Sequence, residues 1–158
     1  MSGSPQGPRL RDVGVVDVEF GEGVTVIRPT NLYRCVVGAG SFIGPFVEIQ
    51  EGVRVGSRCR IQSHSFICSL VTIGDDCFIG HGVMFVNDLF RTGSPARGDR
   101  TQWRPTVIGS RVSIGSNATI LPCIIADGTV VGAGAVVTRD IAEPGVYAGN
   151  PARRIRKF

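Results

Sequence analysis

The sequence predicts an all-β protein built as a solenoid of short strands, and three observations lead to this fold class. The chain of 158 residues contains 22 glycines, about twice the usual share. Because glycine costs about 1 kcal/mol in a helix interior, this composition disfavours a helical bundle or coiled coil. Large apolar residues recur at every sixth position through much of the chain. This period indicates short strands, each with one inward side chain and each followed by a tight turn.

The six-residue period begins at Val37 and returns a large apolar residue nine times in succession. The position after the apolar residue is glycine in five of these units, where we expect glycine to permit the backbone angles of the turn. The residue four places after the apolar one is small, which suits a narrow interior. The apolar positions are Val37, Ile43, Ile49, Val55, Ile61, Ile67, Ile73, Ile79 and Phe85, and the glycines are Gly38, Gly44, Gly56, Gly74 and Gly80.

The period resumes at Ile108 and continues to Val137, with one shortened unit around residues 123–127. Residues 88–106 lack the period, are polar and contain the only tryptophan, Trp103. We interpret them as a loop that leaves the solenoid, and loops of this length are usually functional. The expected organisation is a flexible N-terminus at 1–12, one β-solenoid domain at 13–150 and a basic C-terminal tail at 151–158.

Composition narrows the class of function. The five cysteines are odd in number and show no C-x-x-C spacing, and the N-terminus lacks an apolar signal core. These features favour a cytoplasmic protein with buried thiols over a disulfide framework or zinc site. No apolar run approaches the length of a membrane span. The net charge is +4, and five basic residues fall in the last 20 positions. This local excess favours a compact anionic ligand over nucleic acid.

The repeat resembles that of the hexapeptide-repeat acyltransferases, whose fold is the left-handed parallel β-helix, over roughly residues 24–150. The segment Gly149-Asn-Pro-Ala after the last unit resembles the ending of members that use acetyl-coenzyme A. In that family three units form one coil, and trimers cover the exposed faces. The resemblance therefore implies a left-handed parallel β-helix, a homotrimer with active sites between subunits, and acetyl-CoA as cosubstrate.

The same resemblance suggests how the coenzyme would bind. Four small residues would expose backbone along which the pantetheine arm could lie: Gly132, Ala133, Gly134 and Ala135. The basic residues nearby would pair with the phosphates of the coenzyme: Arg139, Arg153, Arg156 and Lys157.

The acceptor is indicated by the residues at the start of the loop. Sugar O-acetyltransferases of this family carry a catalytic histidine there, whereas this chain has Asn87 and Asp88. The segment Phe85-Val-Asn-Asp-Leu resembles the corresponding segment of nucleotide-linked amino-sugar N-acetyltransferases. This resemblance implies that Asn87 accepts a hydrogen bond from the attacking amine. An amine with a pKa near 8 is already partly neutral at pH 7.5 and needs no strong base. The implied substrate is a dTDP- or UDP-linked amino-deoxyhexose.

Two alternatives remain. His64 and His81 are 17 residues apart and should adjoin on neighbouring coils, where either could act as a base or contact a phosphate. That reading gives an O-acetyltransferase of a sugar or antibiotic hydroxyl. The other alternative is a non-catalytic trimeric scaffold. A zinc hydratase of the same fold is excluded, because it needs three histidine ligands and the chain has two. No metal is expected.

Four further residues are candidates for substrate binding: Glu48, Phe66, Asp88 and Arg91. Phe66 should lie one coil from Glu48, among outward aromatic residues that would form either trimer contacts or a platform for a sugar. Asp88 would assist catalysis or cap the loop. Arg91, like Arg97 and Arg100, could hold the diphosphate of the nucleotide.

Overall fold

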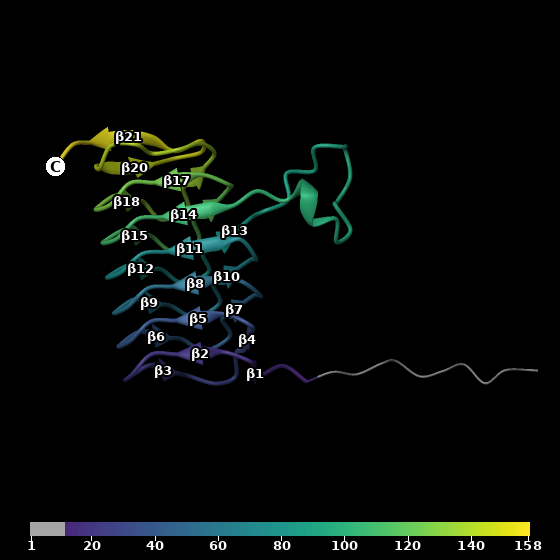
Figure 1. Ribbon diagram of the computed structural model, residues 1–158. Helices are drawn as coiled ribbons and strands as arrows, with labels where there is room; N and C mark the ends of the chain where they lie inside the picture. Colours follow the sequence, from purple (N-terminus) through teal and green to yellow (C-terminus); the bar gives the residue numbers. More distant parts are fainter. Residues whose placement is uncertain (1–11) are drawn as a thin grey trace, which may run out of the picture.

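The structure is a computed structural model that describes residues 12–158. The predicted flexible segment 1–12 therefore lies outside the described residues except for Asp12. The described chain forms a left-handed parallel β-helix of about 7 coils stacked along one axis, with a loop projecting from its side (Figure 1). This confirms the predicted fold class. Within residues 12–158, no helix has the length and apolar character needed to cross a membrane.

Each coil contributes one short strand to each of three parallel sheets. The first sheet contains β1 (Val15–Val16), β4 (Asn31–Tyr33), β7 (Glu48–Ile49), β10 (Phe66–Ile67), β13 (Met84–Phe85), β16 (Thr119–Ile120) and β19 (Val136–Val137). The second contains β2 (Glu19–Phe20), β5 (Val36–Val37), β8 (Arg54–Val55), β11 (Val71–Ile73), β14 (Thr106–Ile108) and β17 (Ile124–Ile125). The third contains β3 (Thr25–Val26), β6 (Phe42–Ile43), β9 (Arg60–Ile61), β12 (Phe78–Ile79), β15 (Ser113–Ile114), β18 (Val130–Val131), β20 (Val146–Ala148) and β21 (Arg153–Arg156).

The strand register confirms the predicted stacking of residues 18 apart. Phe66 pairs with Glu48 on one side and with Met84 on the other, and Phe78 pairs with Arg60. After the projecting loop, Ile108 pairs with Ile125, so this coil is one residue shorter. The shortened unit in the sequence is therefore real.

The predicted apolar column fills the interior of the solenoid. Its nine members from Val37 to Phe85 are all buried, as are Ile108, Ile114, Ile120, Val131 and Val137. All five cysteines are free and buried. Burial raises the pKa of the Cys68 and Cys123 thiols to about 12, so both remain protonated and inert at neutral pH.

Glycine follows the apolar position for a different reason from the one the sequence suggested. Gly38 and Gly80 are absent from the residues with positive φ, whereas the left-handed conformation falls two places later, at residues such as His64 and Asn117. A Cβ added to Gly38 would lie 2.5 Å from the carbonyl carbon of Gly56 on the next coil. The glycines are therefore required by the close approach of successive coils, and the expectation based on turn angles is wrong.

Two edges of the prism are important for the site. The Asn87 corner is where the chain passes from the first sheet to the second, at residues 50–52, 68–70, 86–88, 121–123 and 138–140. The His81 corner is where it passes from the third sheet to the first, at residues 44–47, 62–65, 80–83, 115–118 and 132–135.

The projecting loop leaves the Asn87 corner and occupies residues 86–105, between β13 and β14 (Figure 1). It contains one short 3-10 helix, η1 (Arg100–Gln102), which Asp99 caps. Thr106 already belongs to β14. At the other end of the chain, β21 pairs antiparallel with β20, so half of the segment 151–158 is a strand attached to the third sheet.

We predict that Gly38→Ala destabilises the protein by about 1–3 kcal/mol, because its methyl group would overlap backbone atoms that cannot move aside. Gly14→Ala is the matched control, since a Cβ there meets nothing within 4 Å. Its effect should stay within about 0.5 kcal/mol. Denaturant unfolding measures both variants, and equal midpoints would contradict the explanation.

Candidate active site

The Asn87 corner gathers polar side chains from three successive coils at the root of the loop. By register, Glu51, Ser69 and Asn87 occupy equivalent positions, one coil apart. Backbone hydrogen bonds and the buried residues Ile49, Ile67 and Phe85 of β7, β10 and β13 hold these positions in place. The site is therefore built on the regular part of the fold, although its chemistry lies in the turns.

Asn87 is half-buried, and its side chain is fixed in one orientation. The amide nitrogen Nδ2 donates a hydrogen bond to the carbonyl oxygen of Ser69 at 3.0 Å. Because a carbonyl can only accept, this bond determines which end of the amide is nitrogen. No group of residues 12–158 donates to the oxygen Oδ1. Asn87 thus presents a fixed acceptor at the edge of the solenoid.

Asp88 braces the loop. One carboxylate oxygen accepts a hydrogen bond from the backbone N–H of Phe90 at 2.9 Å, and the other accepts from Ala96 at 2.7 Å. These contacts correspond to the loop-capping role that the sequence offered as one of two options. Both carboxylate oxygens of Asp88 therefore accept hydrogen bonds from backbone N–H groups.

A hollow of about 340 Å³ lies between the loop and the coils, beside Asn87. Phe66 and Gln50 line it from the coils, while Phe90 and Trp103 line it from the loop. Arg97 adds a guanidinium that makes no ion pair with the described residues. An apolar aromatic wall with a few polar groups is the usual character of a small-molecule site.

Gln50 is a site residue that sequence reasoning missed. Its Nε2 donates to Oε1 of Glu48 at 3.0 Å, and its Oε1 accepts from the backbone N–H of Ser69 at 3.3 Å. The carbonyl of Ser69 then accepts from Asn87. Glu48 is therefore linked to Asn87 by a chain of hydrogen bonds across three coils. Residues 18 apart stack in one column, and counting by 18 places Gln50 beside Cys68 and Val86 at the same corner as Asn87. This was the signal that could have revealed Gln50.

The remaining predicted substrate residues do not lie together. Phe66 borders the hollow, whereas Arg91 is exposed on the loop and does not line it. Arg100 forms an ion pair with Glu51 at 2.6 Å. Arg100 therefore attaches the loop to the coils, whereas Arg97 lines the hollow.

The two histidines belong to the His81 corner, at the opposite edge of the first sheet from Asn87. The Nδ1 atom of His81 forms a hydrogen bond with Oγ of Ser63 at 2.8 Å. The ring of His64 stacks on Phe46, with centroids 4.8 Å apart. Each histidine has its own partner, and neither lines a hollow with Asn87 of the same chain.

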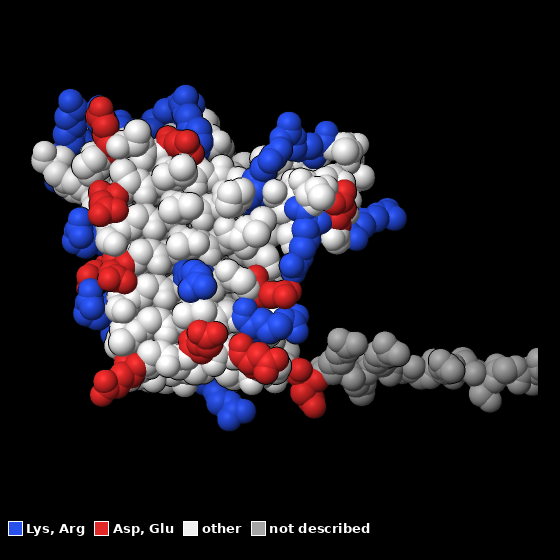
Figure 2. All heavy atoms as spheres, viewed as in Figure 1, with Lys and Arg blue, Asp and Glu red and all other residues white. Residues whose placement is uncertain are grey.

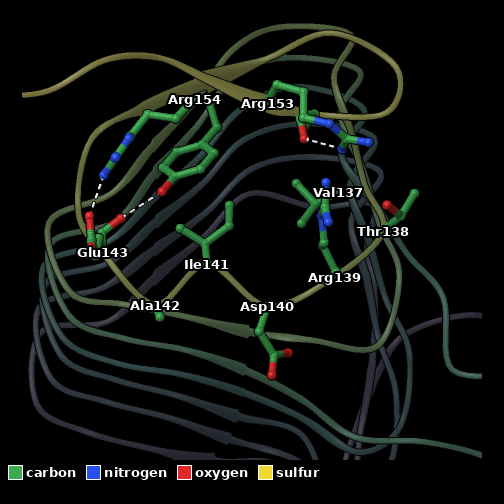
Figure 3. A pocket seen from close by; sticks show the side chains of 11 residues that line it. Val137, Thr138, Arg139, Asp140, Ile141, Ala142, Glu143, Arg153 and Arg154 are labelled. Carbon is green, nitrogen blue, oxygen red and sulfur yellow. Dashed lines mark hydrogen bonds and ion pairs between the residues drawn. The ribbon is translucent and has the colours of Figure 1, made fainter.

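A second hollow, of about 390 Å³, lies at the C-terminal end between the last coil and the β20–β21 hairpin (Figure 3). Val137 and Ile141 contribute apolar surface, and Arg139 and Arg153 lie on the same side of it. Neither arginine pairs with a carboxylate of the described chain, whereas Arg154 pairs with Glu143 on the other side. Figure 2 shows basic side chains gathered at this end and on the loop. Two unneutralised guanidinium groups at one hollow favour an anion.

The four small residues form the uppermost complete turn of the His81 corner. Ala135 points into the core, and Gly132 lies under Ala148, whose Cβ would be 3.1 Å from an added methyl group. Ala133 and Gly134 are exposed. Gly134 has a φ of +67° and open space around it. These two residues are the part of the turn that offers accessible backbone.

The predicted coenzyme residues are thus divided between two edges of the prism. Arg139 belongs to the Asn87 corner, two coils above Asn87, because residue 85 pairs with 120 and 120 with 137. Ala133 and Gly134 lie on the far side of β19. Arg156 and Lys157 are exposed in the C-terminal segment. No group of three or more His, Cys, Asp or Glu suited to a metal occurs in residues 12–158.

Comparison with protein families identifies the repeat. Residues 34–69 and 105–139 match the family described as bacterial transferase hexapeptide (six repeats). Residues 70–84 match the hexapeptide repeat of succinyl-transferase. Together the matches cover more than half of the chain. The chain belongs to the hexapeptide-repeat transferase family.

Curated members of the hexapeptide-repeat transferases with similar sequences include the bifunctional protein GlmU of several bacteria. The chain is 33% identical to GlmU of Pseudarthrobacter chlorophenolicus over 147 residues, which is 82% of this chain and 28% of that protein. For GlmU of Micrococcus luteus the identity is 32% over 148 residues, or 89% and 29% of the two proteins. The chain spans less than a third of the length of these relatives.

Solved structures of hexapeptide-repeat acyltransferases share the fold. A mutant of AntD, an N-acyltransferase from Bacillus cereus in complex with dTDP and coenzyme A, superposes with a TM-score of 0.77 at 20% identity. The alignment covers 88% of this chain and 84% of AntD. The acetyltransferase VCA0836 of Vibrio cholerae, complexed with acetyl coenzyme A, gives a TM-score of 0.59 at 24% identity, covering 81% and 70%. At these identities the likeness establishes the fold.

We predict that Asp88→Ala loosens the loop, because two backbone N–H groups lose their carboxylate acceptor. Tryptic cleavage after Arg91 and Arg97 should accelerate at least about fivefold, since proteolysis follows local opening. Glu22→Ala serves as control, because the Glu22 side chain makes no hydrogen bond within the described chain. Unchanged cleavage in Asp88→Ala would show that these bonds do not hold the loop.

Proposed function

We propose that the protein transfers the acetyl group of acetyl-CoA to the amine of a nucleotide-linked amino sugar, a dTDP- or UDP-linked amino-deoxyhexose. The observation that carries this proposal is the Asn87 amide, whose nitrogen is bound to Ser69 and whose oxygen remains an acceptor beside the hollow. An amine donates a hydrogen bond to such an oxygen. A hydroxyl acceptor would instead require a base that can take its proton.

The reaction needs no strong base from the protein. The amine donates one N–H to Oδ1 of Asn87, which aims its lone pair at the thioester carbonyl carbon. The new C–N bond forms as the carbonyl oxygen takes negative charge, and the C–S bond then breaks. The departing thiolate of coenzyme A takes the proton that the amine loses. Asn87 thus acts by orientation, which contributes through effective concentration of the reactants.

The C-terminal hollow fits the phosphate end of the coenzyme. Arg139 and Arg153 supply two cations without carboxylate partners, and Arg156 and Lys157 add charge nearby. At about 4.8 Å per strand, Arg139 lies about 10 Å above Asn87 along the same corner. The coenzyme would therefore run along this edge, supplying the activated acetyl group near Asn87 and its phosphates to the arginines.

The division of the coenzyme residues between two corners supports an active site shared by subunits. In a cyclic trimer whose axis follows the coils, the Asn87 corner of one subunit would face the His81 corner of the next at equal height. The exposed backbone of Ala133 and Gly134 would then stand opposite Arg139. We propose that the protein is a homotrimer of this kind. We also place the reaction in the cytoplasm, where the buried cysteines would remain thiols.

Several predicted substrate residues find roles in this arrangement. Phe66 would contact the sugar in the hollow, and Glu48 would act through Gln50 on the Asn87 network. Asp88 would support the loop. Arg91, exposed on the loop, would reach the diphosphate of the nucleotide.

The hydrogen bond between His81 and Ser63 favours a second candidate, the O-acetylation of a sugar or antibiotic hydroxyl. In the proposed trimer the His81 corner of a neighbour, which also carries His64, would come to face Asn87. A histidine base from that corner could then remove a hydroxyl proton. The third candidate, a non-catalytic scaffold, would retain the hollows without turnover.

A thioester-consumption screen across nucleotide-linked amino sugars, with simple sugar alcohols alongside, tests these candidates. We expect turnover of an amine and its loss in Asn87→Ala, with kcat falling by about 100-fold because one oriented hydrogen bond is removed. The KM for acetyl-CoA should stay within about twofold.

The other outcomes of the screen separate the alternatives. Turnover of sugar alcohols but of no amine would show that the acceptor is a hydroxyl. His64 and His81 would then be the candidate bases. Absence of acetyl-CoA binding by calorimetric titration at millimolar concentration would favour the scaffold. Unchanged turnover in Asn87→Ala would remove Asn87 from the mechanism.

We predict that subunit mixing restores activity between two inactive variants. Asn87→Ala removes the acceptor, and Ala133→Trp fills the exposed turn without disturbing a core position. If each site joins Asn87 of one subunit to Ala133 of the next, equal mixing leaves about one quarter of the sites intact. Co-refolded mixtures should recover that share of activity. No recovery would place both residues in a site formed by one chain.

A further inference from the structure

The loop is attached to the coils in two places of different kinds. At its root, the N–H of Arg104 donates to the carbonyl of Asn87 at 2.9 Å, and Asp88 binds two loop amides. Farther out, residues 89–103 make one hydrogen bond or ion pair to the coils of the described chain, from Arg100 to Glu51 at 2.6 Å. Apart from the bonds of Asp88 to Phe90 and Ala96, the far part of the loop therefore has one polar attachment within the described chain.

This attachment reaches two coils toward the N-terminus from Asn87. Glu51 lies in the turn after β7 and also approaches Arg34 at 3.5 Å. The hydrogen bond and charge of Arg100, together with the charge of Arg34, hold the pKa of Glu51 below its usual range. Glu51 therefore stays ionised at neutral pH, as its ion pair with Arg100 requires.

Arg100 connects the attachment to the wall of the hollow. Its guanidinium lies over the indole ring of Trp103, 5.6 Å from the ring centroid. The 3-10 helix Arg100–Gln102 leads directly into Trp103, and Asp99 caps the helix through the N–H of Thr101. Trp103 and Phe66 line the same hollow, from the loop and the coils respectively. The position of the indole is thus set by where Arg100 is held.

We propose that Glu51 is a positioning residue that holds Trp103 over the hollow, and that the sugar ring of the acceptor binds between Trp103 and Phe66. The chemistry of the walls suits a pyranose, which has C–H faces for the aromatic rings and polar edges for Gln50 and Asn87. The proposal rests on the proposed function for the identity of the ligand. The role of Glu51 in placing Trp103 is independent of it.

Kinetics of Glu51→Gln test the role of this ion pair in acceptor binding. An exposed ion pair changes an equilibrium by at most about fivefold, so we expect the acceptor KM to rise about three- to fivefold. The kcat should change less than about twofold, as should the KM for acetyl-CoA, because the Asn87 network is untouched. Arg100→Gln should behave alike, and the double variant should be no worse than either single one.

Trp103 supplies a readout that does not require turnover, because it is the only tryptophan of the chain. In Glu51→Gln, acrylamide should quench its fluorescence more strongly than in the wild type. The acceptor selected by the thioester screen should protect Trp103 in the wild type, whereas dTDP or UDP alone should not. Asp127→Asn is the matched control. It breaks the exposed ion pair between Asp127 and Arg111, whose charged atoms are 3.1 Å apart, and this pair does not involve the loop.

The outcomes separate this proposal from the proposed function. Unchanged quenching and unchanged acceptor KM in Glu51→Gln would overturn the positioning role even if an amine is acetylated. Protection of Trp103 by the nucleotide alone would overturn the sugar assignment. If no amine turns over, the proposed function fails, while stronger quenching in Glu51→Gln but not in Asp127→Asn would still support the attachment.

Discussion

The direct stacking of one coil on the next is the constraint on which the rest of the structure depends. Backbone hydrogen bonds join each strand to its equivalent one coil away, and glycines such as Gly38 allow the turns to approach closely. Stacking converts a six-residue period into straight columns of side chains. Asn87, Ser69 and Glu51 lie one above another because they share such a column, although 36 positions separate the first from the last. The strand register between coils therefore determines which residues form the site.

Most of the fold could be predicted from the sequence, because each repeat unit makes the same local choice. The inward column from Val37 to Phe85, the 18-residue stacking and the shortened unit before Val131 were all readable from the chain. The role of glycine was not, since a period cannot distinguish a residue needed for its φ from one needed for close approach. Only the position of the next coil, as at Gly38 and Gly56, separates the two reasons.

The site was predictable where it follows the columns and unpredictable where it depends on the loop. The alignment of Phe66 with Glu48, and of Asn87 with Ser69, follows from counting along the period. The hydrogen bonds of Gln50 and the ion pair of Glu51 with Arg100 do not, because the aperiodic loop has no register to count. The separation of Arg139 from Ala133 was missed for another reason: the prism has three edges, and the two residues lie on opposite sides of β19.

Because Arg139 lies above Asn87 in the same column, the distance between them is a whole number of coil spacings. Adding or deleting one coil between them would change their separation by about 4.8 Å and would leave every other column in register. A solenoid can therefore be matched to a longer or shorter cosubstrate by changing the number of its coils, without redesigning either end. Globular folds lack this property, because their sites converge from elements whose spacing cannot be altered independently.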